Sequence, residues 1–160
     1  MEKNKYFFGL DLSLNSTGIS VFTTDDMLFI ENSTIAIDKS SPEMRETKNK
    51  LKYIGTELLK YKKAYKPEFI VIETAFMRFV KSTAQLMRVH GVVEYLFADV
   101  PQYYIPATTI KKQLTGKGNS EKEVVADAIL KIYPKMKFTT LDESDACAIC
   151  ICFGIQKGWI

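Results

Sequence analysis

The sequence predicts an α/β domain in which helices cover both faces of a central sheet. Residues 6–22 consist of an apolar, β-rich run, a small polar turn and a second apolar run, which is typical of a β-hairpin. Residues 69–72 (FIVI) form a continuous apolar run, as expected of a strand that is covered on both faces. Between and after these strands, apolar residues recur at helical spacing.

The composition is that of an ordinary globular chain. With 160 residues, we expect a single domain over residues 1–160 that buries a proper core. Hydrophobic residues make up 46% of the chain, yet no apolar run reaches the length of a transmembrane helix. The first residues lack a signal-peptide pattern, so we expect a cytoplasmic protein without membrane contact. A net charge of +3 permits a nucleic-acid partner without requiring one.

The three cysteines, Cys147, Cys150 and Cys152, lie close together near the C-terminus. Their spacing on a helix offers no two useful disulfides. A zinc site would need a second pair of cysteine or histidine ligands, which the sequence lacks. We therefore expect all three to be small buried hydrophobic residues.

The first half of the chain continues the sheet and then adds a helix. Residues 27–34 predict a third strand, which completes an antiparallel meander. Ser41 as the cap and Pro42 at the first helical position predict the start of a long helix that ends near Lys63. The buried face of this helix is marked by Met44, Leu51, Ile54, Leu58 and Tyr61.

The second half alternates short elements with helices. Residues 101–106 predict a fifth strand, residues 107–114 a short helix, and residues 115–119 a flexible basic loop. Ser120 and Glu123 predict a capping box at the start of the next helix. Residues 140–143 contain a second capping box, which opens a last helix that ends near residue 156.

Residues 83–99 predict a helix that is apolar on two sides. One side is formed by Leu86, Val89, Val93 and Leu96, and the other by Met87, Gly91 and Tyr95. Such a helix must be covered on both sides. We expect the sheet to cover one side and a second subunit to cover the other, with Leu86, Val89, Gly91 and Val93 as candidate interface residues. The alternative is a helix sandwiched within one chain.

Four carboxylates stand out by their positions. Asp11 lies inside an apolar strand, where a buried carboxylate needs a partner such as a metal cation, unless it faces solvent near the strand end. Glu73 ends the predicted central strand, where ligand sites gather in sheets of this kind. Asp142 and Asp145 share one face of the last helix, although acids are common at helix N-termini.

Together these four acids predict a metal-dependent site. If the last helix packs across the sheet, all four converge, and clustered carboxylates repel one another unless cations bind between them. Mg²⁺ suits such a site because it prefers hard oxygen ligands. Two such ions roughly 3.5–4 Å apart can clamp the attacking water and the leaving oxygen of a phosphodiester. The predicted chemistry is therefore phosphodiester hydrolysis.

The residues that carry these predictions resemble the RuvC-type Holliday junction resolvases of the ribonuclease H-like superfamily, with a bacteriophage member as one expectation. The resemblance covers nearly the whole chain. It is carried by residues 9–11 with Thr17 and Gly18, by residues 72–76, by the loop of residues 111–122 and by residues 142–146. The first of these motifs lacks the Pro-Gly turn that is common in bacterial members.

The resemblance implies both a fold and an activity. The implied fold is a mixed five-stranded sheet flanked by helices on both faces. The implied catalytic and metal-binding residues are Asp11, Glu73, Asp142 and Asp145, with two Mg²⁺ or Mn²⁺ ions. The implied active form is a homodimer, in a bacterial or phage-infected bacterial cell, that cuts two strands of a four-way DNA junction and accepts other branched DNA.

The resemblance also implies contacts to DNA. Phe76 occupies the place of an aromatic residue that stacks on an unpaired base, with Phe79 as a competitor for this role. Lys111 and Lys122 match positions where the family keeps lysines near the scissile phosphate, and Lys117 is a further candidate in the glycine-rich loop. For each lysine, the alternative is a solvated surface charge.

Three other functions compete with a junction endonuclease. One is a ribonuclease that acts on RNA–DNA hybrids, which would not require a two-faced helix. Another is a catalytically silent, junction-binding dimer, against which the presence of all four acids argues. Sugar or acetate kinase-like folds open on a similar strand, turn and strand, but they need two such domains, and this chain is too short.

Overall fold

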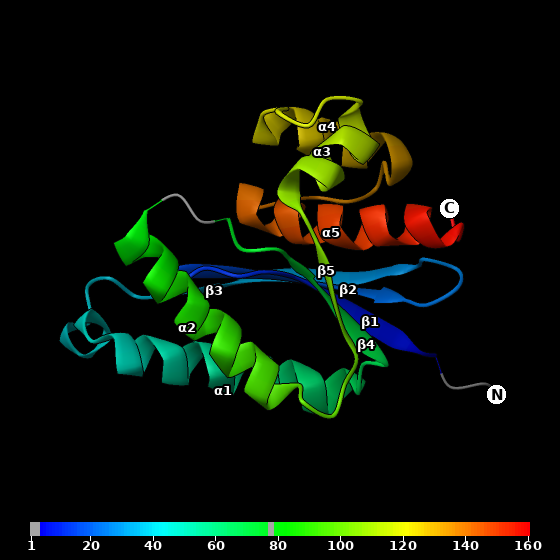
Figure 1. Cartoon of the computed structure of the whole chain (residues 1–160). Coiled ribbons are helices and arrows are strands. Elements are labelled where there is room, and N and C mark those ends of the chain that lie inside the picture. The colour runs from blue at the N-terminus through cyan, green and yellow to red at the C-terminus, as the bar shows by residue number, and fades with distance from the viewer. Residues whose placement is uncertain (1–3, 77–78) are drawn as a thin grey trace.

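A five-stranded mixed sheet forms the centre of the molecule in the computed structural model, which describes residues 4–76 and 79–160 (Figure 1). The strands lie in the order β3-β2-β1-β4-β5. Strands β1, β2 and β3 pair antiparallel, whereas β4 pairs parallel with both β1 and β5. The bounds of the strands are β1 Tyr6–Asp11, β2 Ser16–Thr23, β3 Phe29–Ala36, β4 Phe69–Glu73 and β5 Gln102–Ile105.

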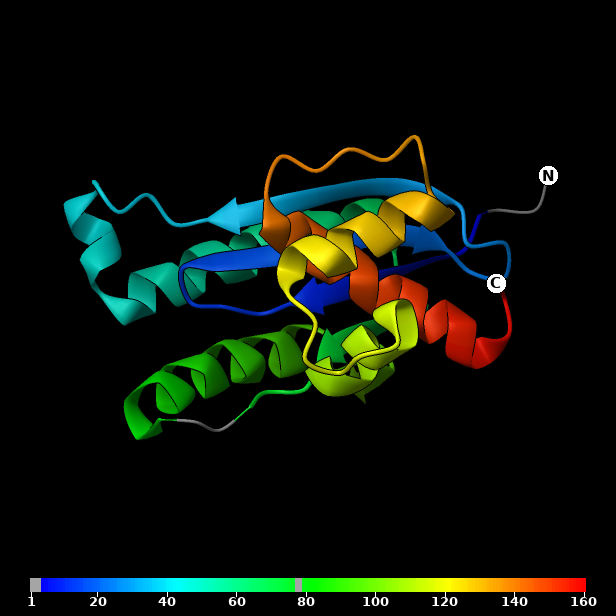
Figure 2. The ribbon, with the colours of Figure 1, turned by 90° about the horizontal axis from the view of Figure 1, so that it is seen from above.

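Helices cover both faces of this sheet, as the sequence predicted. The helix α1 (Thr47–Tyr65) and the helix α2 (Val80–Leu96) pack on one face, and α5 (Leu141–Lys157) packs on the other (Figure 1). The helices α3 (Ala107–Thr115) and α4 (Lys122–Ile132) lie on the outer side of α5, which runs obliquely across the strands (Figure 2). Among the described residues, no helix has both the length and the apolar character needed to cross a membrane.

The alternation of side chains along the strands divides the core in two. On β1, Phe7 faces α5, whereas Phe8 and Leu10 face α1 and α2. The predicted strand β4 is covered on both faces, as expected. Val71 packs on the α5 side, whereas Ile70 and Ile72 pack on the side of α1 and α2. Both faces of the sheet are packed with buried apolar side chains. The sheet is therefore a rigid support for the side chains at the ends of its strands.

Of two predicted helix starts, one is correct only for a shorter helix than expected and the other is wrong. Ser41 and Pro42 open only a short 3₁₀ helix, η1 (Pro42–Arg45), because Glu46 has an extended backbone (φ −87°, ψ 130°), and α1 begins at Thr47. Ser120 does not cap α4, which begins after the extended Glu121 without a side-chain cap. Instead, the Ser120 hydroxyl lies 2.6 Å from that of Thr115.

The third strand begins at Phe29, two residues later than the sequence predicted. Asp25 (φ 67°) and Met27 (φ 52°) adopt the left-handed conformation, which a strand residue does not adopt. Met27 is nevertheless buried, because its side chain packs against Gly154 on α5. The apolar pattern therefore identified a core residue correctly but assigned it to the wrong element.

The cysteines confirm their predicted role. All three are free and buried: Cys147 and Cys150 face the sheet from α5, whereas Cys152 contacts Gln113 on α3. Burial raises the pKa of the Cys147 thiol to about 12 and that of Cys152 to about 11. These thiols therefore stay protonated at neutral pH and act as small apolar side chains.

Candidate active site

Two of the four predicted acids meet at one edge of the sheet. β1 and β4 are parallel neighbours, and Leu10 pairs with Ile72 in their register. Asp11 and Glu73 directly follow this pair and end their strands. Because parallel strands place their carboxyl ends at the same edge, the two carboxylates lie side by side there.

The N-terminus of α5 is fixed by a capping arrangement that differs slightly from the predicted one. The Thr140 hydroxyl accepts a hydrogen bond from the backbone N–H of Glu143 at 3.3 Å, as predicted. The Glu143 carboxylate reaches back one residue further than in a capping box and accepts hydrogen bonds from the backbone N–H (2.8 Å) and hydroxyl (2.6 Å) of Thr139. These contacts hold the first turn of α5, which carries Asp142, with Asp145 on the turn that follows.

Two glycines allow α5 to lie almost on the backbone of the sheet. A Cβ atom at Gly18 would stand 2.5 Å from the carbonyl oxygen of Asp142, and one at Gly9 would stand 2.5 Å from that of Ala146. A larger residue at either position would push the helix outward. The close approach brings Asp142 and Asp145 over the end of β1.

The result is a compact acidic cluster. Carboxylate oxygens of Asp11, Asp142 and Asp145 lie within 4.8 Å of one another, which is close enough to share a cation. Glu73 lies outside this set of three but is near enough to raise the pKa of Asp11 by its charge. All four predicted acids are therefore found at one site.

The cluster carries a large electrostatic cost when no cation is bound. Burial, and then the charges of Glu73 and Asp145, raise the pKa of Asp11 to about 8. Burial likewise raises the pKa of Glu73 and of Asp145. Because each carboxyl group raises the pKa of its neighbours, the charged forms are unfavourable without a cation. A divalent cation bound between them favours the charged form of each, so these acids are suitable metal ligands.

Two lysines face the cluster, as predicted. The Lys122 ammonium group lies 2.5 Å from Asp145 Oδ2 and 3.6 Å from Asp142 Oδ1. Burial lowers the pKa of Lys122, but the contact with Asp145 and the surrounding acids raise it overall. The positive charge of Lys111 lowers the pKa of Glu73 and of Asp145, so this side chain also lies near the site.

The other predicted DNA-contacting residues lie further out. Phe76 follows β4, and 71% of its side chain is exposed, while its competitor Phe79 is exposed to the same degree. Lys117 is exposed in the loop between α3 and α4, where its ammonium group forms no ion pair with the residues described.

Sequence reasoning missed one residue that orients the site. The hydroxyl of Ser16, at the start of β2, donates a hydrogen bond of 2.6 Å to Asp142 Oδ2. This contact occupies one carboxylate oxygen and leaves Oδ1 facing Lys122. A serine in a polar turn is too common to be singled out, and only the packing of α5 against β2 shows its role.

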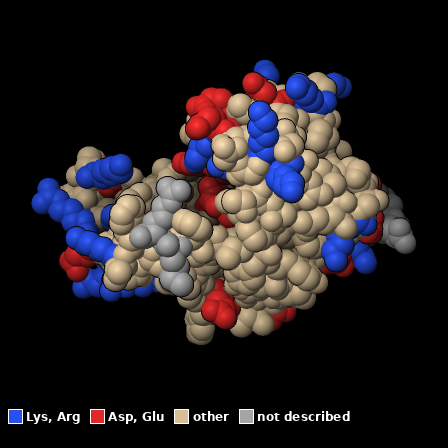
Figure 3. Space-filling model, turned by 45° about the horizontal axis from the view of Figure 1, so that its top comes forward, with Lys and Arg blue, Asp and Glu red and all other residues tan. Residues whose placement is uncertain are grey.

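The surface around the cluster is recessed. Figure 3 shows acidic side chains at the bottom of a hollow, with lysine and arginine side chains along its upper rim. A recess with an acidic floor and a basic rim can hold a cation against the protein and a phosphate above it.

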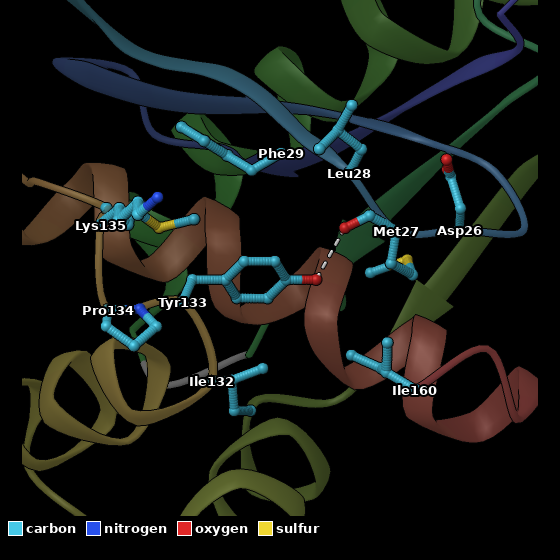
Figure 4. A pocket seen from close by; sticks show the side chains of 10 residues that line it. Asp26, Met27, Leu28, Phe29, Ile132, Tyr133, Pro134, Lys135 and Ile160 are labelled. Atoms are coloured by element: carbon cyan, nitrogen blue, oxygen red, sulfur yellow. Dashed lines mark hydrogen bonds between the residues drawn. The ribbon is translucent and has the colours of Figure 1, made fainter.

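A separate cavity of about 660 Å³ lies beside the turn between β2 and β3, at the other end of the strands from the acids (Figure 4). It is lined by Asp26, Met27, Leu28, Phe29, Ile132, Tyr133, Pro134, Lys135, Met136 and Ile160. The Tyr133 hydroxyl donates a hydrogen bond of 2.8 Å to the Met27 carbonyl oxygen within it. Its mostly apolar walls hold no group of acids, so the chemistry belongs to the acidic recess.

Comparison with known proteins supports a single family. Residues 7–153 match the family model described as crossover junction endodeoxyribonuclease RuvC. The RuvC protein of Ehrlichia chaffeensis is 28% identical over 153 residues, covering 93% of this chain and 96% of that protein. The one from Ehrlichia ruminantium is 32% identical over 152 residues, covering 90% and 92%. Both are bacterial, and neither supports a bacteriophage origin.

The fold also matches a solved structure. Thermus thermophilus RuvC, solved in complex with a Holliday junction substrate, superposes with a TM-score of 0.79 at 21% identity, covering 97% of each chain. The resolvase fold expected from the sequence is therefore confirmed. With the family model matching nearly the entire length, this chain belongs to the RuvC family of crossover junction endodeoxyribonucleases.

Proposed function

We propose that this protein resolves four-way DNA junctions by hydrolysing one phosphodiester bond in each of two strands. The observation that carries the proposal is the convergence of Asp11, Asp142 and Asp145 within 4.8 Å, with Glu73 beside them. Relatives named crossover junction endodeoxyribonuclease and the Thermus thermophilus complex with junction DNA support the substrate. A junction-binding protein without catalysis would have no use for so costly a group of partly buried acids.

Two Mg²⁺ ions, for which Mn²⁺ can substitute, are the proposed cofactors. The donor set fits them, because it consists of carboxylate oxygens, the ligands that Mg²⁺ prefers. Asp11 is the central ligand, since it is close to the other three acids, and Ser16 orients Asp142. When bound, such ions lower the pKa of a water molecule and neutralise charge on a phosphate.

The lysines take part in substrate binding. Lys122 contacts two of the acids, and Lys111 lies beside Glu73, so both ammonium groups border the place where a phosphate would approach the cations. Their charge offsets that of the phosphodiester, which gains negative charge during attack. Lys117 lies on the outer surface, where it contacts the DNA that flanks the cut, and the exposed Phe76 follows Glu73 by three residues, where it stacks on a base.

A synthetic four-way junction and a linear duplex of the same sequence test this function. With Mg²⁺, we expect paired nicks near the crossover of the junction and an intact duplex. With Ca²⁺, we expect junction binding without cutting. If the junction is bound but never cut with any divalent cation, the protein is a binding module and the proposal is wrong.

The exposed face of α2 supports a homodimer as the active form. Val89 and Val93, which the sequence assigned to the interface, are buried in the core instead, and Leu86 packs against the same core, so that part of the prediction is corrected. The open face is formed by Met87 (50% exposed), Gly91 and Tyr95 (81% exposed), which are spaced four residues apart along one side. We propose that this stripe contacts a second copy.

Replacing Met87 and Tyr95 together with glutamate is expected to raise the dissociation constant of the dimer by at least about thirtyfold, because it places charges in an apolar contact. Sedimentation measures this change, and paired junction nicks should become single nicks. Leu28→Glu is the matched control, since Leu28 is also exposed but lies away from α2. A double variant that remains a dimer would show that another surface is used.

A further inference from the structure

A second cavity, of about 600 Å³, opens directly beside the carboxylate cluster. Three segments form it: the residues after β4, the first turn of α3, and the loop between α3 and α4. Phe76 and Pro106 contribute apolar wall, whereas Thr108 and Asn119 contribute hydrogen-bonding groups. Small-molecule sites have this size and this mixture of apolar walls with a few polar groups.

The cavity lies next to the carboxylate cluster, because two of its lining residues adjoin the acids. Thr74, on its wall, is the residue that follows Glu73, and its backbone N–H donates a hydrogen bond of 3.0 Å to the carbonyl oxygen of Ile105 on the neighbouring strand. Lys111 lines the cavity and lies near Glu73 and Asp145. A DNA strand with its phosphate at the acids would therefore place an adjacent nucleotide at this cavity.

The loop that closes the cavity is held in a defined shape. The Thr115 hydroxyl lies within hydrogen-bonding distance of the carbonyl oxygens of Lys111 (2.7 Å) and Lys117 (3.1 Å). It also lies 2.6 Å from the Ser120 hydroxyl. Gly118 lies against α3, since a Cβ there would stand 3.2 Å from the Thr108 carbonyl oxygen. These contacts present Asn119 at a fixed position.

The lining matches the chemistry of a nucleobase. An aromatic ring provides a surface for stacking, and the Asn119 amide offers a donor and an acceptor side by side, which suits the edge of a base. The Asn119 amide forms no hydrogen bond with any residue in the described ranges, whereas the Thr115 and Ser120 hydroxyls of the same loop are bonded to each other and to backbone. The Thr108 hydroxyl can donate or accept.

We propose that this cavity binds one base of the strand being cut, and that Asn119 and Thr108 read its edge and so set a preference for the cleavage sequence. The inference rests on the proposed function, because a bound junction brings the base to the cavity. It goes further by assigning sequence preference to residues outside the carboxylate site.

A panel of junctions with each of the four bases at every position near the cut tests this inference. We expect the wild-type chain to prefer one base at a single position, and Asn119→Ala to reduce that preference by about tenfold, through slower cleavage of the junction that carries the preferred base. An abasic nucleotide at that position should lower the wild-type rate, and the loss should not add to that of Asn119→Ala. Asn4→Ala is the control, because Asn4 is exposed at the opposite edge of the sheet.

A binding measurement separates the inference from the proposed function. With Ca²⁺, the fluorescent base 2-aminopurine at the same position should be quenched on binding, and Phe76→Ala should relieve the quenching. If the junction is cut but Asn119→Ala leaves the base preference intact, or no position shows quenching, only the inference is wrong. If the wild-type chain neither binds nor cuts junctions, both are wrong.

Discussion

Replacing Asp11 with asparagine is expected to slow junction cleavage by at least about a thousandfold while junction binding persists. The other three acids all raise the pKa of Asp11, so its loss removes the proposed central ligand for the cations. Such ions stabilise the transition state by several kcal/mol, and each 1.4 kcal/mol is a factor of ten in rate. Single-turnover cleavage of a labelled junction measures the loss, and gel shift with Ca²⁺ measures binding.

The same variant is expected to make the metal-free protein more stable. Burial and neighbouring acids raise the pKa of Asp11 to about 8 in the folded chain, against 3.8 for the unperturbed group. Between these values the unfolded chain ionises and the folded chain does not, so ionisation favours unfolding more strongly as pH rises. Asp11→Asn removes this cost, and we expect its free energy of unfolding to exceed that of the wild type by about 2–4 kcal/mol at pH 8 and by little at pH 4.

Urea denaturation with a chelator present, at both pH values, checks this prediction. Asp127→Asn is the control, because Asp127 is an exposed acid on α4 and should change neither cleavage nor the pH dependence of stability. The proposal holds that Asp11 destabilises the metal-free protein and is needed to bind cations. An Asp11→Asn protein that still cuts junctions, or that is less stable than the wild type at pH 8, would contradict it.

Replacing Gly18 with alanine is expected to lower cleavage by at least about a hundredfold. The new Cβ would stand 2.5 Å from the Asp142 carbonyl oxygen, and backbone cannot move aside as a flexible side chain can. The first turn of α5 must shift, taking Asp142 and Asp145 with it, and a displacement of about 1 Å can cost a hundredfold in rate. The readouts are the rate at saturating Mg²⁺ and the apparent affinity for Mn²⁺.

Gly154→Ala provides a matched comparison on the same helix interface. A Cβ at Gly154 would stand 2.7 Å from the terminal methyl group of Met27, which is the flexible end of a side chain. This variant should lose stability through tighter packing but keep its cleavage rate, because Gly154 lies far along α5 from the acids. Equal rate losses in both variants would show that the close approach at Gly18 does not position the site.

Local patterns were sufficient to predict most of the fold. The two apolar runs of β1 and β2, the continuous run of β4 and the capped start of α5 all appear as predicted, because each depends on neighbours along the chain. Ser41 does precede a helix, although a short 3₁₀ helix rather than the long one, whereas Ser120 caps no helix because serine serves turns as well as helix caps. A serine in the sequence therefore does not show by itself where a long helix begins, because the packing around it also matters.

The acids of the site could be identified from the sequence, but their support could not. Asp11 and Glu73 stand out as lone carboxylates at the ends of apolar strands. The contact of Ser16 with Asp142 and the close approach at Gly9 and Gly18 join residues far apart in the chain, so no local pattern reveals them. The exposed side of α2 was recognised as apolar, but two of its predicted interface residues belong to the core.

The location of Mn²⁺ in crystals of the protein is the most direct test of the account. Anomalous diffraction should show density between Asp11, Asp142 and Asp145, with Glu73 beside it, and Asp11→Asn crystals should lose this density. Mn²⁺ bound only elsewhere on the molecule, or unchanged density in the Asp11→Asn crystals, would contradict the claim that these carboxylates bind the cations needed for DNA cleavage.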